Sequence, residues 1–353
     1  MNENPKIKMQ LSCPMPKFDF DTINLGHGSG GVLTHKLLNS GVFNILQNDL
    51  LNEKHDGAIF SLTGKLAFST DSYVVNPIFF PGGDIGELAV NGTVNDLAMC
   101  GSMAKYISLA FIIEEGLPMT DFWEILNSIK TTADKAGVQI VTGDTKVVEK
   151  GKGDKIFINT SGIGVVHENA TINLLSIQAD DVIIVSGNIA SHGIAIMSQR
   201  QGLEFETDIV SDTCNLNFTI EKLLNKFGTD IHFLRDATRG GVASVLNEIA
   251  KDGNCGIEIK QKDIPVLEQV NGACEMLGLD PLYVANEGVF IMVVHKDVTA
   301  DILQALQQDE NGVNAAIIGQ VSNEHKGQVI LQSSIGGKRV VNMLPGEQLP
   351  RIC

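Results

Sequence analysis

The stretch of sequence that decides the fold runs from residue 106 to residue 146 and reads YISLAFIIEEGLPMTDFWEILNSIKTTADKAGVQIVTGDTK. Residues 106–113 are almost continuously apolar, which is typical of a strand buried on both faces. Residues 120–136 repeat apolar side chains on one face of a helix, for which Thr120 is the expected N-cap. Residues 138–142 are again strand-like. A strand, a helix and a second strand in succession predict that sheets and helices pack together here.

The same kinds of element extend outward from this unit. On its N-terminal side we expect strands at 58–62 and 66–70 and a helix capped by Asp84, and on its C-terminal side a strand at 156–166. Because many of these strands are joined as hairpins, the pattern favours α+β lobes over one doubly wound sheet. In the second half, the expected strands lie at 182–186, 257–259, 289–294, 315–321 and 328–331, and the expected helices at 193–201, 240–251, 266–277 and 297–307.

The chain of 353 residues is long enough for two lobes with separate cores. We expect an N-terminal arm with a glycine-rich loop at 1–45, a first lobe at 46–168 and a second lobe at 169–335. Residues 336–353 are expected to form a flexible tail, because the two prolines and the glycine near its end oppose helix and central strand.

Composition narrows the classes of protein to which this chain can belong. A net charge of −16 repels phosphate backbones, so nucleic acid is not an expected partner. The apolar stretches are of strand length and too short to span a membrane, and residues 1–10 have no signal-peptide core. None of the six cysteines forms a C-x-x-C pair, which argues against a zinc site and favours a reducing compartment. We therefore expect a cytoplasmic protein with no membrane partner.

A glycine-rich loop follows the arm. Gly26, Gly28 and Gly31 match the spacing G-x-G-x-x-G, but residues 18–25 alternate polar and apolar side chains and do not form the buried strand that a dinucleotide fold requires. The loop is therefore either a flexible hinge or a backbone loop that binds phosphate. In the second case Gly28, Gly30 and Gly31 are the candidates for nucleotide binding.

Acidic residues near the ends of predicted elements are candidates for binding a metal. Asp71 and Asp144 follow expected strands, and Asp96 lies on the helix that begins after Asp84. Mg²⁺ is bound in proteins by one or two carboxylates together with phosphate oxygens, and Lys146 would add a positive charge for those phosphates. Each single aspartate also fits a turn or a helix cap, so that both interpretations stay open.

The same helix contains Asn91, Gly92 and Asn95. An Asn-Gly pair usually marks a turn, so either the helix ends there or Gly92 allows a ligand to approach the backbone. Asn91 and Asn95 are four residues apart and would share one helix face, which makes them candidates for cofactor binding.

In the second half, Thr238 is the expected cap of a helix whose first N–H groups are open to an anion, with Arg239 beside them. Glu287 precedes a strand and is either a general base, a metal ligand or part of a β-turn. We expect the isolated His192 to be structural.

The last residue is a cysteine. A thiol on a tail is accessible, whereas a buried one is normally inert. We expect the terminal carboxylate to raise the pKa of the Cys353 thiol and Arg351 to lower it. The position is not a prenylation box. Cys353 is therefore either incidental or an exposed functional thiol.

Together these segments resemble the HypE family of carbamoyl dehydratases, which act in the maturation of NiFe hydrogenases and belong with the aminoimidazole ribonucleotide and selenophosphate synthetases. The resemblance covers nearly the whole chain, with two departures, Ala237 where the family usually has Pro and Asn188 where Asp is expected. The matching segments are residues 79–86, 91–98, 143–148, 236–241 and 283–288 and the terminal Pro350-Arg351-Ile352-Cys353.

The resemblance implies a two-lobed, ATP-dependent synthetase fold that forms a homodimer through the sheet of its first lobe. It also implies a reaction in which a HypF-type carbamoyltransferase loads the thiol of Cys353, and this chain dehydrates the carbamoyl group to a thiocyanate with ATP and Mg²⁺. The cyanide then passes to iron on a HypC–HypD scaffold complex. The residues that match these roles are Asp71, Asp96 and Asp144 for the metal, Lys146 for the phosphates, and Glu287, with Asp236 as second candidate, for the general base.

Two other functions remain open at this point. One is a synthetase of the same superfamily that acts on a free small molecule, for which Cys13 would be the only N-terminal thiol. The other is a non-catalytic ATP-binding scaffold for the assembly of a metal centre. Removal of Cys353 separates them, because only the dehydratase would lose its product with its terminal cysteine.

Overall fold

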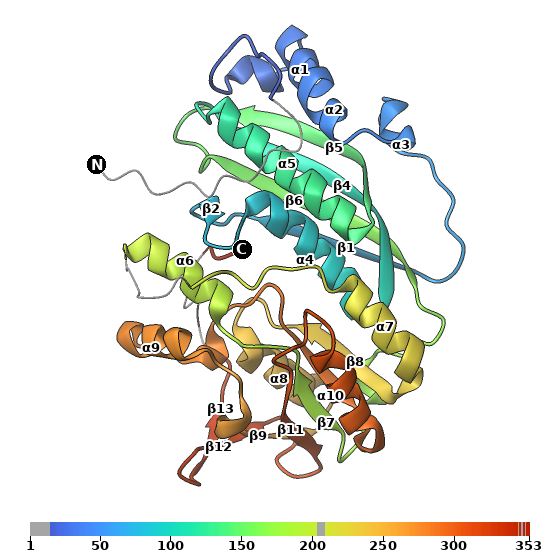
Figure 1. Cartoon of the computed structure of the whole chain (residues 1–353), viewed down its shortest axis with the longest axis vertical. Coiled ribbons are helices and arrows are strands. Elements are labelled where there is room, and N and C mark those ends of the chain that lie inside the picture. The colour runs from blue at the N-terminus through green and yellow to red at the C-terminus, as the bar shows by residue number, and fades with distance from the viewer. Residues whose placement is uncertain (1–14, 203–208, 345, 347–348, 350) are drawn as a thin grey trace.

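The chain folds into two lobes that lie one above the other along its longest axis (Figure 1). The structure is a computed structural model and describes residues 15–202, 209–344, 346, 349 and 351–353. Residues 1–14 of the predicted arm, including Cys13, and Pro350 of the terminal segment lie outside the described residues. The mixture of helices and sheets confirms the predicted α+β class.

The first lobe is built on a sheet in which two helices cover one face. Within the described residues its strand order is β1-β6-β4-β5, and only β4 and β5 are parallel. The helices α4 and α5 lie in front of this sheet in Figure 1. The bounds are β1 Leu66–Tyr73, β4 Ser102–Glu114, β5 Gln139–Val148, β6 Ile156–Val166, α4 Ile85–Met99 and α5 Met119–Ala136.

The second lobe contains a longer sheet, and the short helices of the N-terminal segment pack on the first lobe. In the described part of the chain the sheet order is β13-β12-β9-β11-β7-β10-β8. The strands are β7 Val182–Val185, β8 Ile231–Asp236, β9 Gly256–Lys260, β10 Phe290–Val294, β11 Ala316–Ser322, β12 Val329–Gln332 and β13 Lys338–Val341, with the hairpin β2 Phe79–Phe80 and β3 Gly83–Asp84 in the first lobe. The helices are α1 Val32–Leu37, α2 Phe43–Ile45, α3 Asp49–Asn52, α6 Ser191–Gln201, α7 Asn217–Phe227, α8 Gly241–Asp252, α9 Glu268–Leu277 and α10 Thr299–Gln307.

The central unit predicted from the sequence is confirmed, with differences at its ends. The strand expected at 138–142 continues to Val148 as β5, and the helix α5 begins at Met119 without a side-chain cap, so Thr120 is not its N-cap. Gly137 ends α5 in the left-handed conformation, at φ +68°. Asp84 caps α4 as predicted, because its carboxylate accepts hydrogen bonds from the N–H groups of Gly86 and Glu87.

Two predictions about strands were wrong. Residues 58–62 are extended but belong to no strand, since they find no hydrogen-bond partner among the described residues, and Ile59 is 75% exposed. The segment expected to begin a flexible tail at 336 instead contributes β13, which pairs with β12. No helix in the described part of the chain is long and apolar enough to cross a membrane.

The sequence left open whether α4 ends at Asn91 or continues so that Gly92 admits a ligand. The helix continues, and the group beside Gly92 is a side chain of the protein. A Cβ atom at Gly92 would lie 2.2 Å from the hydroxyl oxygen of Tyr73, which is fully buried. Glycine is therefore required here by close packing of β1 on α4.

We predict that Gly92→Ala lowers the free energy of unfolding by about 1–3 kcal/mol, because overpacking outweighs the higher helix propensity of alanine. Gly272 is a matched control, since it also lies inside a helix, α9, but nothing stands within 4 Å of its would-be Cβ. Gly272→Ala should raise stability by about 0.5–1 kcal/mol. Urea denaturation measures both, and changes of the same sign would contradict the prediction.

Candidate active site

A cluster of carboxyl groups lies where the two lobes meet. Asp71 comes from β1, Asp96 from α4, Asp236 from the end of β8, and Glu287 from the turn before β10. Burial raises the pKa of Asp96, and the charge of Asp71 raises it further. Burial and then Asp96 raise the pKa of Asp236 to about 7. Four residues that the sequence singled out separately therefore influence one another at one site.

Cations and hydroxyl groups partly compensate this negative charge. The guanidinium of Arg239 reaches across from the second lobe to Asp71, with 3.5 Å between Nη2 and Oδ1. The hydroxyl of Ser69 donates to Asp96 Oδ2 at 2.6 Å. Thr238 does not cap α8, because Gly240 is its N-cap and no side chain makes the capping bond. Of the expected anion-binding pair, only Arg239 is shown to contact the acidic cluster.

Glu287 is almost completely buried, at 3% exposure, and its Oε1 atom has no hydrogen-bond partner among the described residues. Burial and the neighbouring Asp212 raise its pKa well above the ordinary value. The Oδ1 atom of Asp212 accepts hydrogen bonds from the N–H groups of Glu287, at 2.7 Å, and Gly288, at 3.1 Å. The sequence did not reveal Asp212, because Ser211-Asp212-Thr213 resembles an ordinary polar linker.

The C-terminal residue lies in the same cluster, and Figure 1 shows the chain end between the lobes, beside β2. The N–H of Val74 donates to the main-chain oxygen of Cys353 at 3.0 Å. Burial and then Glu287 raise the pKa of the Cys353 thiol to about 12, whereas Arg239 lowers it. The accessible thiol expected from the sequence belongs to a residue that is only partly exposed, and the cation that acts on it is Arg239, whereas Arg351 binds Asp154.

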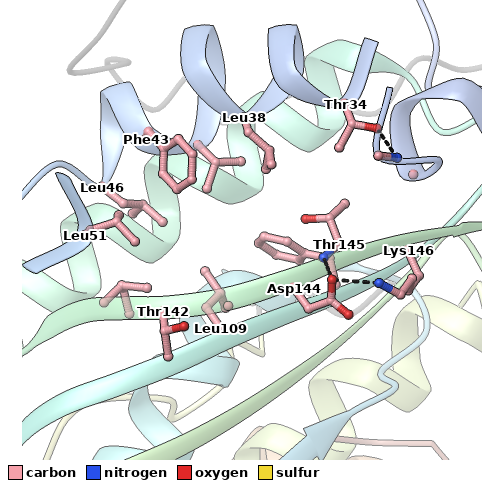
Figure 2. Close-up of a pocket in the computed structure, with 16 residues that line it drawn as sticks. Thr34, Leu38, Phe43, Leu46, Leu51, Leu109, Thr142, Asp144, Thr145 and Lys146 are labelled. Carbon is pink, nitrogen blue, oxygen red and sulfur yellow. Dashed lines mark hydrogen bonds and ion pairs between the residues drawn. The ribbon is translucent and has the colours of Figure 1, made fainter. Parts of the chain in front are cut away.

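The glycine-rich loop lies over β5 beside a cavity of about 180 Å³ (Figure 2). Gly28 and Gly30 line the cavity, but Gly31 does not and instead precedes α1. A Cβ at Gly28 would stand 2.4 Å from the backbone nitrogen of Val147, so glycine is needed for the loop to lie on the strand. The N–H of Gly30 donates a hydrogen bond to the hydroxyl of Thr34 at 3.0 Å. The other lining is mostly apolar: Leu38, Val42, Phe43, Leu46, Leu51, Leu109, Phe111 and Ile140.

Asp144 does not join the other two acids predicted to bind the metal. Cα pairing places Asp144 opposite Ala110, Ala110 opposite Asn159, and Asn159 opposite Ser72, so these four share one face of the sheet. Asp71 precedes Ser72 and therefore points to the other face. Its strand, β1, is also three strand spacings, or about 14 Å, from β5. The three acids therefore do not meet at one place within a single chain, and among the described residues no group of three acids, histidines or cysteines is placed to hold a metal ion. The metal-binding role of Asp144 stays a prediction.

Lys146 accompanies Asp144 on this second face. Its Nζ atom lies 2.8 Å from Asp144 Oδ1, and the hydrogen bond from Lys146 lowers the pKa of Asp144. Figure 2 shows Asp144 and Thr142 on the opposite side of β5 from the helices, whereas Thr145 points into the cavity. The pair is exposed, and it contributes little stability within one chain.

Asn91 and Asn95 both contact the second lobe, and their predicted role in cofactor binding stays a prediction. They share a face of α4, as expected, but that face meets the second lobe. The amide of Asn95 donates to the carbonyls of Cys214, at 2.9 Å, and Glu287, at 3.1 Å, and accepts from the N–H of Leu216. Asn91 donates to Thr213. Because both side chains are buried and bonded to protein, they hold the lobes together.

Comparisons with known proteins agree with this architecture. The model of the AIR synthase related protein N-terminal domain matches residues 54–166, and that of its C-terminal domain matches residues 178–332. The carbamoyl dehydratase HypE of Rhizobium leguminosarum is 45% identical over 94% of this chain and 95% of its own length. That of Escherichia coli K12 is 44% identical over 94% of this chain and its full length.

Solved structures of HypE proteins are also similar to this chain. A crystal structure of the hydrogenase maturation protein HypE in complex with ATP covers 93% of this chain and 99% of its own, with a TM-score of 0.90 and 46% identity. A HypE–HypF complex matches 89% of this chain and 100% of the matched one, with a TM-score of 0.77 and 44% identity. A thiamine monophosphate kinase from Aquifex aeolicus, at 16% identity and a TM-score of 0.58, shares the fold.

The raised pKa of Asp236 predicts a pH-dependent stability. Between about pH 4 and pH 7 the unfolded chain loses this proton while the folded chain keeps it, so wild-type stability falls as the pH rises. For one group the loss amounts to as much as about 4 kcal/mol. Asp236→Asn should therefore be more stable than wild type at pH 8, and the difference should disappear near pH 4.

Urea denaturation at pH 4, 6 and 8 measures this difference, and the titrating groups outside the acidic cluster cancel between the two proteins. Asp144→Asn serves as the control, because the exposed Asp144 should give a nearly flat difference. An Asp236→Asn difference that does not grow from pH 4 to pH 8 would contradict the assignment of a buried, protonated Asp236.

Proposed function

The chain belongs to the AIR synthase related family and within it to the HypE carbamoyl dehydratases, and on this premise we propose how its own residues carry out the reaction. It is an ATP-dependent enzyme of hydrogenase maturation. The observation that supports the proposed mechanism is the position of Cys353. This residue lies among the buried acids of the lobe interface, where the carboxyl group of Glu287 and the guanidinium of Arg239 both act on its thiol.

We propose that the thiol of Cys353 carries the carbamoyl group and presents it to this cluster. ATP, when bound, supplies the phosphoryl group that turns the amide oxygen into a leaving group. The C–O bond then breaks as the two protons leave nitrogen, giving a thiocyanate, ADP and phosphate. Burial of the terminal residue between the lobes keeps water from the reacting carbon. Since the substrate is part of the chain, its effective concentration at the site is high.

Glu287 is our first candidate for the base, with Asp236 as the second. A carboxylate whose pKa is raised by burial is a stronger proton acceptor, once ionised, than an exposed one. Its ionised form is favoured when cations bind nearby. Asp71 and Asp96 are suited to hold Mg²⁺ for the phosphates of ATP, because they provide two neighbouring carboxylates with hard oxygen donors. Arg239 would neutralise charge on the transferred group.

We propose that the cavity beside the glycine-rich loop receives the base of the nucleotide. Its apolar lining suits a flat aromatic ring, and the close contact of Gly28 with β5 keeps the loop at its rim. The position of Lys146 and Asp144 on the other face of the sheet favours a role at a subunit boundary. We retain Lys146 as a candidate for contacting phosphates of a neighbouring subunit's nucleotide.

We propose a homodimer, which would place Lys146 of one chain near the nucleotide of the other. The face of the four-stranded sheet opposite α4 carries exposed apolar side chains, among them Phe68 at 69% exposure, Leu66 and Ile112. Exposed apolar side chains that gather on one face of a sheet are typical of an interface, and a second copy is the proposed occupant. For loading, the partner is a HypF-type carbamoyltransferase, a class with which a relative forms a complex. For delivery, we propose an iron scaffold of the HypC–HypD kind, and the thiol chemistry supports a reducing, cytoplasmic location.

The reaction is tested directly by mass spectrometry of the C-terminal peptide. We expect carbamoylated Cys353 to lose the mass of one water when ATP and Mg²⁺ are added. Glu287→Gln should still bind ATP but form thiocyanate about 10²–10⁴ times more slowly, because it lacks the base. Cys353→Ser should form no thiocyanate.

Consumption of ATP without any change on the terminal peptide would favour a synthetase that acts on a free small molecule. Binding of ATP without its consumption would favour an assembly scaffold. Full activity of Glu287→Gln would exclude Glu287 as the base and leave Asp236 as the candidate.

A further inference from the structure

The end of the chain is held through its backbone and through the side chain of Arg351, which binds Asp154 and donates to the carbonyl of Val74. The last residues run antiparallel to the segment after β1, with the N–H of Val74 bonded to the main-chain oxygen of Cys353 at 3.0 Å and that of Asn76 bonded to the carbonyl of Arg351 at 3.4 Å. The guanidinium of Arg200, on α6, also donates to the carbonyl of Arg351. Two of the three main-chain oxygens of the terminal tripeptide are thus bound, with donors from both lobes.

The third carbonyl, that of Ile352, is bound by His192. This side chain stands at the start of α6 and is completely buried. Its Nε2 atom lies 3.0 Å from the carbonyl oxygen of Ile352, and its Nδ1 atom lies 2.8 Å from the hydroxyl of Ser211. A carbonyl only accepts hydrogen bonds, so Nε2 must carry the proton and Nδ1 accepts from Ser211. Burial lowers the pKa of His192 to about 4, which keeps the ring neutral and in this tautomer at physiological pH.

The loop that orients His192 also contacts the proposed base. The hydroxyl of Ser211 accepts from the N–H of Thr213 at 3.1 Å. Between these two residues, Asp212 accepts from the N–H groups of Glu287, at 2.7 Å, and Gly288, at 3.1 Å. The histidine, the loop and Glu287 therefore form one continuous hydrogen-bonded unit. At one end His192 contacts the Ile352 carbonyl of the tail, and at the other end Asp212 contacts the proposed base, Glu287.

The side chain of Ile352 adds an apolar contact between the tail and the two lobes. It is only 3% exposed and joins the core of the first lobe together with Ile196 and Ala285 of the second. The ring of His192 packs edge-on against Phe80, with 5.6 Å between the ring centres. The binding site for the tail is therefore shaped by both lobes, and the histidine is fixed within it.

We propose that His192 is a positioning residue for the dehydration, which holds the Ile352 carbonyl through Nε2–H and thereby keeps Cys353 beside Glu287. The inference rests on the proposed function for its catalytic consequence, but the docking of the tail can be measured without any reaction. From the sequence alone, this histidine is expected to be structural. Its direct bond to the residue before the substrate-bearing cysteine gives it a more specific role.

The test is the rate at which iodoacetamide alkylates Cys353 in the full-length protein without ATP. His192→Phe keeps a ring against Phe80 but removes the donor, so the tail should leave its site more often and alkylation should become about tenfold faster. His192→Gln retains an N–H donor and should stay within about threefold of wild type. The exposed Cys100 provides an internal reference whose rate should not change.

His232→Phe is the matched control, because His232 is also buried and hydrogen-bonded, to Asp181 at 2.7 Å, but lies on β8 away from the tail. It should lower the melting temperature without changing the alkylation of Cys353. Ser211→Ala is a milder second variant for the case that His192→Phe does not fold. It removes the hydroxyl that fixes the tautomer of His192, and it should accelerate alkylation of Cys353 about threefold. An unchanged rate in the folded His192 variant and in Ser211→Ala would overturn the proposal, as would equal acceleration by His232→Phe.

A second measurement separates this inference from the proposed function. With carbamoylated protein, His192→Phe should reduce the rate of thiocyanate formation at saturating ATP about tenfold and leave the ATP concentration for half-maximal rate unchanged. Full activity in that variant would also overturn the positioning role. If wild type itself forms no thiocyanate, the proposed function fails, and the alkylation rates still decide whether His192 holds the tail.

Discussion

The arrangement of the molecule depends on the burial of several carboxyl groups at the junction of its two lobes. Asp96, Asp236 and Glu287 are each removed from water, and each makes ionisation of its neighbours less favourable. The electrostatic cost of these neighbouring carboxyl groups has to be offset by other contacts between the lobes. The amide of Asn95 supplies three hydrogen bonds between α4 and the second lobe, and Arg239 supplies a positive charge. The site thus retains unfavourable electrostatics because neutral contacts around it stabilise the interface.

Much of the fold was predictable where the hydrophobic pattern was long. The strand at 156–166 and the unit at 106–146 were found because buried strands and a long amphipathic helix leave strong patterns. The helix α7, Asn217–Phe227, was missed, although its buried residues Ile220, Leu223, Leu224 and Phe227 repeat at helical spacing. The strand β8, Ile231–Asp236, was missed because His232 and Arg235 interrupt its apolar pattern. Residues 58–62 have a strand pattern but no partner, which sequence alone does not reveal.

The candidate site was predictable residue by residue but not as an arrangement. Asp71, Glu287 and Cys353 were each identified from local signals, yet only the fold shows that they meet. Asp144 was misplaced because β5 continues beyond residue 142, and the alternation of side chains along a strand then decides which face the carboxylate occupies. Asp212 gave no signal at all, because its role depends on a turn that is distant in the sequence.

The docking of the terminal residues between the lobes makes the chain both catalyst and reagent. On the proposed function, each polypeptide carries one carbamoyl group on Cys353 and processes that single group before it has to be reloaded. The conversion is then unimolecular, and its rate constant does not depend on dilution of the protein, unlike that of an enzyme supplied with a diffusing substrate. Reloading by a partner would require Ile352, which is 3% exposed here, to leave its place between the lobes and return.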